Sequence, residues 1–245
     1  MKRGNENISK DAFKRAVDEA ARNGAQAVQL TGGEPVLHED LAELIDYTRG
    51  CGLLSVVATS GYNASYEYYR RLKQAGLSAI CVSLNGITRE ASLLSREALD
   101  KSLYAIKCAI QAELICFVNT VVSDENVDEL NLLGRYVRDK GAIGVNILRP
   151  VCSYDEKYAP SISQDTIIKI EMAVKSMPDF YRVENCYKEY WRYISGNEFA
   201  CKDIGEKTYF INADGTFSPC SKLLKHKYPT LNDMINAHEW KMGCR

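Results

Sequence analysis

The chain has 245 residues, of which 46% are hydrophobic and 26% charged. This balance is typical of a globular protein and excludes fibrous and disordered classes. Lys and Arg number 31 against 32 Asp and Glu, so no basic field predicts a nucleic acid or a membrane surface as partner. The apolar runs have the length of strands and are too short to cross a bilayer. We also expect no secretory signal at the start of the chain.

Nine cysteines are present, and an odd number argues against a closed disulfide framework. We therefore expect a reducing, cytoplasmic location. Six of the nine stand singly in apolar or irregular stretches, where a cysteine usually acts as a small buried hydrophobe: Cys51, Cys81, Cys108, Cys116, Cys152 and Cys186. The other three lie in a polar C-terminal segment: Cys201, Cys220 and Cys244.

One unit recurs along the chain: an amphipathic helix, a glycine-containing turn and a short β-rich run. The first helix is expected to begin after a Ser9 cap and to end at Gly24, with Phe13 and Val17 on its apolar face. Further helices are expected before each later strand, and another runs from Ser163 to just before residue 178. The strands expected in this pattern are residues 26–30, 53–58, 79–84, 114–122 and 143–148.

Helices alternating with strands at this spacing indicate parallel βα units. The predicted fold class is therefore α/β, a partial (β/α)6 barrel of parallel strands in which five strands can be counted. We place this barrel in residues 1–178. Residues 179–245 are aromatic, contain cysteine and include a hairpin-like stretch over 209–217 with an Asp-Gly turn, so we predict a second, small module there.

Parallel βα sheets bind ligands at the carboxyl ends of their strands. The residues at these ends are small or polar and suit a polar small molecule. Two glycines followed by Glu34 would let a ligand amine reach backbone carbonyls and a carboxylate. The alternative is a tight turn in which Glu34 caps the helix that follows. The strand-end residues are Gly32, Gly33, Glu34, Pro35, Thr59, Ser60, Ser83, Asn85, Asn119 and Arg149.

Four of these segments resemble motifs of radical S-adenosylmethionine (SAM) enzymes, and they occur in the same order. Residues 30–35 (LTGGEP) resemble the GGEP motif, and residues 59–61 (TSG) resemble the polar end of the next strand. Residues 82–86 (VSLNG) resemble a Ser-Leu-Asp-Gly pattern with Asn85 in place of Asp, and residues 119–122 (NTVV) resemble an Asn-Thr-Val element.

The resemblance implies a role for each strand-end residue. Gly32, Gly33 and Glu34, with Pro35 completing the motif, would hold the methionine amine of SAM. Arg149 would hold an anionic group near the last strand, unless it is an ordinary surface residue. The SAM carboxylate and ribose would be contacted by Thr59, Ser60, Ser83 and Asn119.

The C-terminal segment resembles the opening of a SPASM or twitch module, which binds auxiliary iron–sulfur clusters in enzymes that modify peptides or proteins. Cys220 follows Cys201 after eighteen residues, within a hairpin-like sequence, and Cys244 could supply a third ligand. The resemblance implies an auxiliary cluster, of the 4Fe-4S type, held by these thiolates. The alternative is three free surface thiols, since no fourth ligand follows.

One departure from the family pattern is serious. Radical SAM enzymes carry a Cys-x-x-x-Cys-x-x-Cys loop after their first strand, whereas the first cysteine of this sequence, Cys51, already follows the GGEP motif. We therefore expect this sequence to lack the first strand and the cluster loop. We expect SAM binding to be weak or lost in this chain, and no radical chemistry by the family mechanism.

Two main readings remain. In the first, the chain is part of a truncated radical SAM enzyme that acts on a peptide or protein substrate. In the second, it is a degenerate, non-catalytic barrel that binds a peptide or a partner. A third reading, acid–base catalysis in an ordinary βα barrel, ranks last because Glu34 and the nearby His38 are the only titratable candidates.

A missing first strand would also leave the strand at residues 26–30 as a bare, apolar edge. Natural proteins cover such edges because they template pairing with other chains. We therefore predict that the first helix, the N-terminus or a second chain covers Val28 and Leu30.

Overall fold

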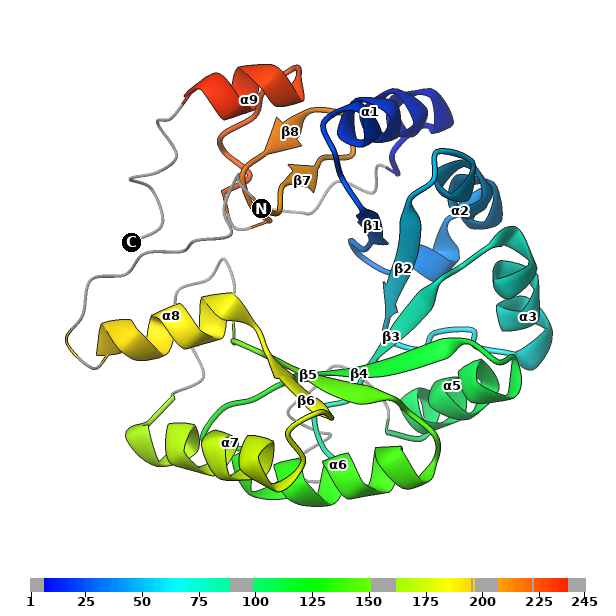
Figure 1. The fold of residues 1–245 in the computed structure, drawn as a ribbon. Helices are drawn as coiled ribbons and strands as arrows, with labels where there is room; N and C mark the ends of the chain where they lie inside the picture. Colours follow the sequence, from blue (N-terminus) through cyan, green and yellow to red (C-terminus); the bar gives the residue numbers. More distant parts are fainter. Residues whose placement is uncertain are drawn as a thin grey trace.

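The computed structural model describes residues 7–88, 99–150, 162–194, 196, 207–221 and 223–237. In this part of the chain, six parallel strands form one sheet whose spatial order is the order of the sequence (Figure 1). The sheet is curved, and helices line its outer side. This confirms the predicted partial (β/α)6 barrel. The strands are β1 (Ala27–Leu30), β2 (Leu54–Thr59), β3 (Ala79–Ser83), β4 (Ile115–Val121), β5 (Gly144–Leu148) and β6 (Tyr181–Val183).

Helices connect successive strands, as parallel pairing requires. Their apolar faces pack against the outer side of the sheet and form the main core, in which Leu72, Ile80, Ile106, Val118 and Leu133 are fully buried. The helices are α1 (Lys10–Arg22), α2 (Leu41–Gly50), α3 (Tyr66–Ala75), α5 (Leu99–Gln111), α6 (Leu130–Asp139), α7 (Gln164–Ser176) and α8 (Asn185–Ile194), with single 3-10 turns at η1 (Pro35–Leu37) and η2 (Val127–Glu129).

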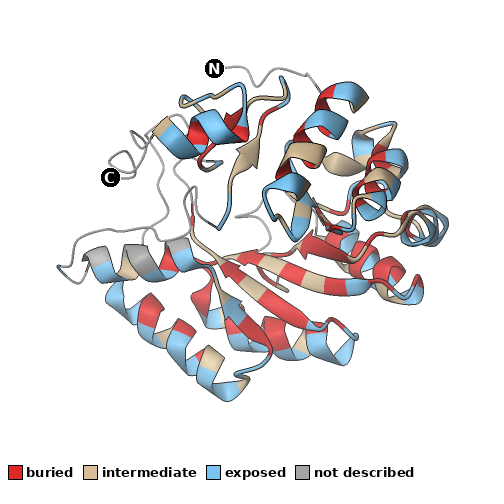
Figure 2. Ribbon diagram, turned by 45° about the horizontal axis from the view of Figure 1, so that its top comes forward, coloured by how far each residue is buried: buried red, intermediate tan, exposed pale blue. Residues whose placement is uncertain are grey.

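Burial alternates along β2 and β4, and Figure 2 shows the buried and intermediate residues of the strands by colour. On β2, Val57 and Thr59 face the helices and are buried, while the residues between them point to the concave side. Leu54 and Ile115 on that concave side remain 59% and 48% exposed. In a closed barrel these apolar side chains would be interior, so the concave side of this sheet is an accessible surface.

The first helix forms as predicted. Ser9 caps it by accepting a hydrogen bond from the Ala12 amide at 3.2 Å, and Phe13, Val17 and Ala20 are buried along one face. Gly24 follows the helix with a φ of 82°, a left-handed conformation that favours glycine.

The number of strands predicted from the sequence was wrong by one. A sixth strand, β6, pairs with β5 beyond residue 178, and α8 follows it. A strand of three residues is too short to show a period-two pattern, and its aromatic surroundings read as irregular sequence. The sheet thus continues into the segment that the sequence assigned to the second module.

The predicted hairpin is present as β7 (Phe210–Ile211) and β8 (Phe217–Ser218), which pair antiparallel around a turn with Gly215 at a φ of 81°. A last helix, α9 (Leu231–Ala237), packs with the hairpin on α1. Here Phe217 and Met234 are buried against Ala16. A carboxylate oxygen of Glu19 also accepts a hydrogen bond from the Leu231 amide at 2.6 Å, joining α1 to the start of α9.

The edge at β1 is covered in part, as predicted. Val28 and Leu30 are half-buried and pack against the cluster formed by Phe13 and Val17 of α1. Among the described residues, no strand pairs with the free edge of β1. The helix therefore covers Val28 and Leu30 in part, while a second chain at the backbone of this strand remains a prediction.

Gly134 on α6 is required by the position of β6. A Cβ built there would lie 1.8 Å from the Tyr181 hydroxyl oxygen, which donates to the Leu130 carbonyl at 2.6 Å. We expect Gly134→Ala to lower the free energy of unfolding by about 1–3 kcal/mol through overpacking. Gly50→Ala, at a helical position with open space around the Cβ, serves as the control. Urea unfolding tests this, and equal loss in both variants would contradict it.

Candidate functional site

The Gly-Gly-Glu segment forms an open loop at the carboxyl end of β1. Gly32 has a φ of 140°, a backbone angle that residues with a side chain rarely adopt. No atom lies within 4 Å of a Cβ built at Gly32 or Gly33. Both glycines are exposed. Pro35 then begins η1. The backbone of this loop is thus accessible to a ligand, as the sequence predicted.

The Glu34 carboxylate joins this loop to the end of β2. One oxygen accepts from the Thr59 hydroxyl at 2.6 Å, and the other accepts from the Ser60 amide at 2.8 Å and from the Ser60 hydroxyl. Glu34 also caps η1 through the Val36 amide at 3.4 Å, as the alternative interpretation expected. Four donors occupy the carboxylate, so in this arrangement Glu34, Thr59 and Ser60 shape the loop.

Ser83 and Asn119 lie side by side at the ends of β3 and β4, where the strand register pairs them. Both are half-buried on the concave side. The Asn119 side-chain oxygen accepts from the Asn146 amide nitrogen on β5 at 2.8 Å. This contact uses only the side-chain oxygen of Asn119. The two amide hydrogens of Asn119 are therefore available to acceptors of a bound molecule. Sequence analysis missed Asn146, although a polar residue alternating with apolar ones in a strand was a usable signal.

A second group of polar residues fixes the loops after β3 and β4. The Asn126 amide donates to the carbonyls of Asn85 and Val121 at 2.9 and 2.8 Å, and the Asn85 side chain accepts from the Val121 amide. Glu129 accepts from the Ile87 amide at 2.8 Å. Asn85 lies in the VSLNG motif, whereas the bond from Asn126 to Asn85 and the bond from Ile87 to Glu129 span about forty residues and leave no local pattern.

Two further candidates have structural partners. The Arg149 amide donates to a Glu184 carboxylate oxygen at 3.3 Å, at the ends of β5 and β6. His38 uses both ring nitrogens, one 3.2 Å from the Ile8 carbonyl oxygen and the other 3.1 Å from the Asp40 amide. His38 therefore anchors the start of α1 to the loop after η1, and the acid–base interpretation gains no support from it.

The three cysteines proposed as cluster ligands are only partly covered by the structure. Cys201 and Cys244 lie outside the described residues, and Cys220 follows β8 in a half-buried position. Within the described ranges, no group of three or more Cys, His, Asp or Glu is arranged to hold a metal ion. The cluster ligands stay a prediction.

The hairpin turn carries a perturbed carboxyl group. Asp214 accepts from the Lys227 ammonium and from Thr216, and these bonds lower its pKa to about 2. The stabilisation by the ionised Asp214 carboxylate is therefore fully present above the unfolded-state pKa near 4, and it is lost as the pH falls toward 2. We expect the difference in unfolding free energy between the wild type and Asp214→Asn to shrink between pH 4 and 2. A difference independent of pH would contradict this.

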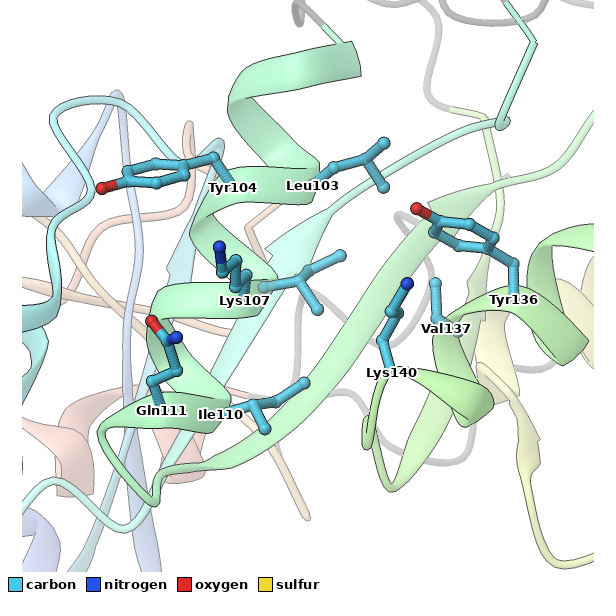
Figure 3. Close-up of a pocket in the computed structure, with 9 residues that line it drawn as sticks. Leu103, Tyr104, Lys107, Ile110, Gln111, Tyr136, Val137 and Lys140 are labelled. Carbon is cyan, nitrogen blue, oxygen red and sulfur yellow. The ribbon is translucent and has the colours of Figure 1, made fainter.

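A groove of about 590 Å³ lies between α5 and α6 on the outer side of the barrel (Figure 3). Its floor is apolar, with Ile106 and Val137, and Lys107, Tyr136 and Lys140 stand at its rim. It is formed by helices and not by strand ends. We therefore assign it no part in the candidate site.

The residues at the strand ends fit SAM, whereas the described residues do not supply a cluster. The exposed residues Gly32 and Gly33 offer backbone carbonyls, which suit an ammonium group, and Ser83 and Asn119 suit carboxylate and hydroxyl groups. Among the described cysteines, Cys81, Cys108 and Cys116 are buried in separate elements.

SAM binding to the 245-residue chain should be weak. Without iron to chelate the amine and carboxylate, each remaining hydrogen bond contributes only about 1 kcal/mol. We expect a dissociation constant in the millimolar range, or no detectable binding. Isothermal titration calorimetry measures this, and a micromolar constant would contradict it.

No helix in the described ranges is both long and apolar enough to cross a membrane.

Comparison with known proteins identifies the family. The model of the radical SAM superfamily matches residues 1–136. The AdoMet-dependent heme synthase of Methanosarcina barkeri is 29% identical over 143 residues, which are 57% of this chain and 41% of the relative. The PqqA peptide cyclase of Rhodopseudomonas palustris is 31% identical over 132 residues, 52% of this chain and 34% of the relative. The chain thus spans about two fifths or less of these relatives.

A solved structure, native anSMEcpe with bound AdoMet and Kp18Cys peptide, has the same fold, with a TM-score of 0.67 at 16% identity. The match covers 96% of this chain and 72% of that protein. The family model spans more than half of the sequence, and the four strand-end motifs lie where the fold brings them together. This chain belongs to the radical SAM superfamily.

Proposed function

We propose that this chain forms the SAM-binding part of a radical SAM enzyme that modifies a peptide or protein. The observation that carries the proposal is the open Gly-Gly-Glu loop, which Glu34 ties to the end of β2 beside Ser83 and Asn119. The peptide substrate is supported by two relatives, one named a peptide cyclase and one solved with a bound peptide.

We assign each residue a role that its position supports. The carbonyls of Gly32 and Gly33 accept hydrogen bonds from the methionine amine, and Glu34, Thr59 and Ser60 hold these carbonyls in place. Asn119 and Ser83 bind the carboxylate and ribose oxygens, and Asn146 orients the Asn119 amide. Bound SAM would supply hydrogen-abstraction chemistry on the substrate, once an iron–sulfur cluster provided the electron for its reductive cleavage.

The C-terminal segment is proposed to hold an auxiliary iron–sulfur cluster through Cys201, Cys220 and Cys244. Thiolates suit iron, and they must stay reduced, which is consistent with the expected cytoplasmic location. The hairpin that precedes Cys220 packs on α1 and would fix this ligand relative to the barrel.

A second candidate is a binding module without radical chemistry. The observation in its favour is that the 245 residues contain no Cys-x-x-x-Cys-x-x-Cys sequence. Against it stands the exposed backbone of Gly32 and Gly33, since a module that binds only a peptide has no need of an amine-accepting loop of this kind.

The experiment extends the chain at its N-terminus with the first strand and three-cysteine loop of a radical SAM relative. After anaerobic reconstitution with iron and sulfide, dithionite and SAM are added and 5′-deoxyadenosine is measured. We expect product above that of a matched extension in which the three cysteines are alanine. Equal product in both would overturn the proposed radical SAM function and favour the binding module.

A further inference from the structure

Among the described strand residues, the concave side of the sheet carries one charged residue, Arg182. Because side chains alternate between the two sides of a strand, the strand register shows which residues share this side. Arg182 pairs with Asn146 on β5, which in turn pairs with Asn119 and, beyond it, Ser83. The other described strand residues on this side are uncharged: Ala27, Gln29, Leu54, Val56, Ala58, Ala79, Cys81, Ile115, Phe117, Val121, Gly144 and Leu148.

The guanidinium of Arg182 is held by stacking. Its central carbon lies 4.5 Å from the centroid of the Phe117 ring on β4, a distance typical of a cation–π contact. Gly144 on β5, between the two strands, makes room for this contact. A Cβ built there would lie 3.2 Å from an Arg182 nitrogen and 3.2 Å from the Phe117 ring.

Stacking holds one face of the guanidinium and leaves the donors at its edge available. Arg182 is exposed, and within the described residues no hydrogen bond or ion pair to its side chain is found. The acidic residue nearest along the chain, Glu184, accepts instead from the Arg149 amide. Arg182 is thus a cation fixed in position whose N–H groups have no partner in the described part of the chain.

We propose that Arg182 binds a carboxylate of the substrate, so that the site selects a peptide segment with one acidic residue flanked by apolar residues. A planar guanidinium matches the two oxygens of a carboxylate. A single cation balances a single negative charge. The half-buried Val121 and Leu148, which pair one step beyond Asn119 and Asn146 on the same side of the sheet, offer apolar contacts. This inference rests on the proposed function, since it names the class of substrate for the same site.

The test uses the 245-residue chain and two blocked tripeptides, acetyl-Leu-Glu-Leu-amide and acetyl-Leu-Gln-Leu-amide. NMR follows the arginine Nε–H signals, with that of Arg182 assigned by its loss in Arg182→Gln. We expect the Glu peptide to shift the Arg182 signal in a saturable manner, with an affinity at least fivefold higher than that of the Gln peptide. In Arg182→Gln, the chemical-shift changes of the backbone amides should give equal affinities for the Glu peptide and the Gln peptide.

Arg138→Gln is the matched control, because Arg138 lies over the Phe180 ring at 5.8 Å on the outer side of the barrel. It should keep the preference for the Glu peptide. Equal affinities for the two peptides, or a preference that survives Arg182→Gln, would overturn the inference. A saturable shift of the Arg182 signal by SAM and not by the Glu peptide would also overturn the inference, because Arg182 would then bind the carboxylate of SAM.

These outcomes are separate from those of the proposed function. If the extended chain cleaves SAM but the peptides bind equally, only the role of Arg182 fails. If the Glu peptide is preferred but no extended chain cleaves SAM, the radical function fails and Arg182 remains a carboxylate site.

Discussion

The 245-residue chain, reconstituted anaerobically with iron and sulfide and supplied with dithionite and SAM, is expected to form no 5′-deoxyadenosine above background. The sequence contains no Cys-x-x-x-Cys-x-x-Cys. The described cysteines in the barrel form no group of three with His, Asp or Glu that could hold a metal ion, and burial raises the pKa of the Cys81 thiol to about 11 and that of Cys116 to about 12. Thiols of such high pKa are poor iron ligands at neutral pH.

The control for this experiment is the extended chain with its three cysteines, treated in the same way. Formation of 5′-deoxyadenosine by this control shows that the reagents are active and that the strand ends can bind SAM. Multiple turnovers by the 245-residue chain alone would contradict the prediction and would mean that other cysteines hold the required cluster.

Glu34→Ala is expected to give the largest loss of stability at the site, about 2–3 kcal/mol in the free energy of unfolding. The carboxylate receives hydrogen bonds from Thr59 and from two groups of Ser60, and bonds to charged groups contribute about 1.5–3 kcal/mol each. Partial exposure of Glu34 and relaxation of the loop reduce their sum. Urea unfolding followed by circular dichroism measures the change.

Glu39→Ala is the matched control, since Glu39 is an exposed carboxylate only five residues away. It should change the unfolding free energy by less than about 0.5 kcal/mol. If Glu34→Ala had as small an effect, the carboxylate would not hold the loop to β2, and Glu34 would be available to a ligand.

Much of the fold could be predicted from the sequence because the βα units are locally consistent. The Ser9 cap, the apolar face of α1 and the end of that helix before Gly24 are set by residues within a few positions of one another. The sixth strand could not be predicted in this way. Tyr181–Val183 is identified by its pairing with β5, and such long-range pairing leaves no local signal.

The candidate site shows the same division. Gly32, Gly33, Glu34 and Asn119 were found because they lie within short motifs at the strand ends. The partners that complete the site were not found, since Asn146 and Arg182 meet Asn119 and Phe117 only through the order of the strands. The hydrogen bonds that Thr59 and Ser60 donate to the Glu34 carboxylate likewise follow from the pairing of β1 with β2.

The position of SAM is tested most directly by its affinity for the extended, reconstituted chain and two variants. Asn119→Ala removes a proposed ligand at the end of β4, and Lys107→Ala changes the groove between α5 and α6. If SAM binds at the strand ends, Asn119→Ala should weaken its binding about fivefold, as expected for the loss of one hydrogen bond, and Lys107→Ala should leave it unchanged. Unchanged affinity in Asn119→Ala together with a loss in Lys107→Ala would place SAM in the groove and contradict the account.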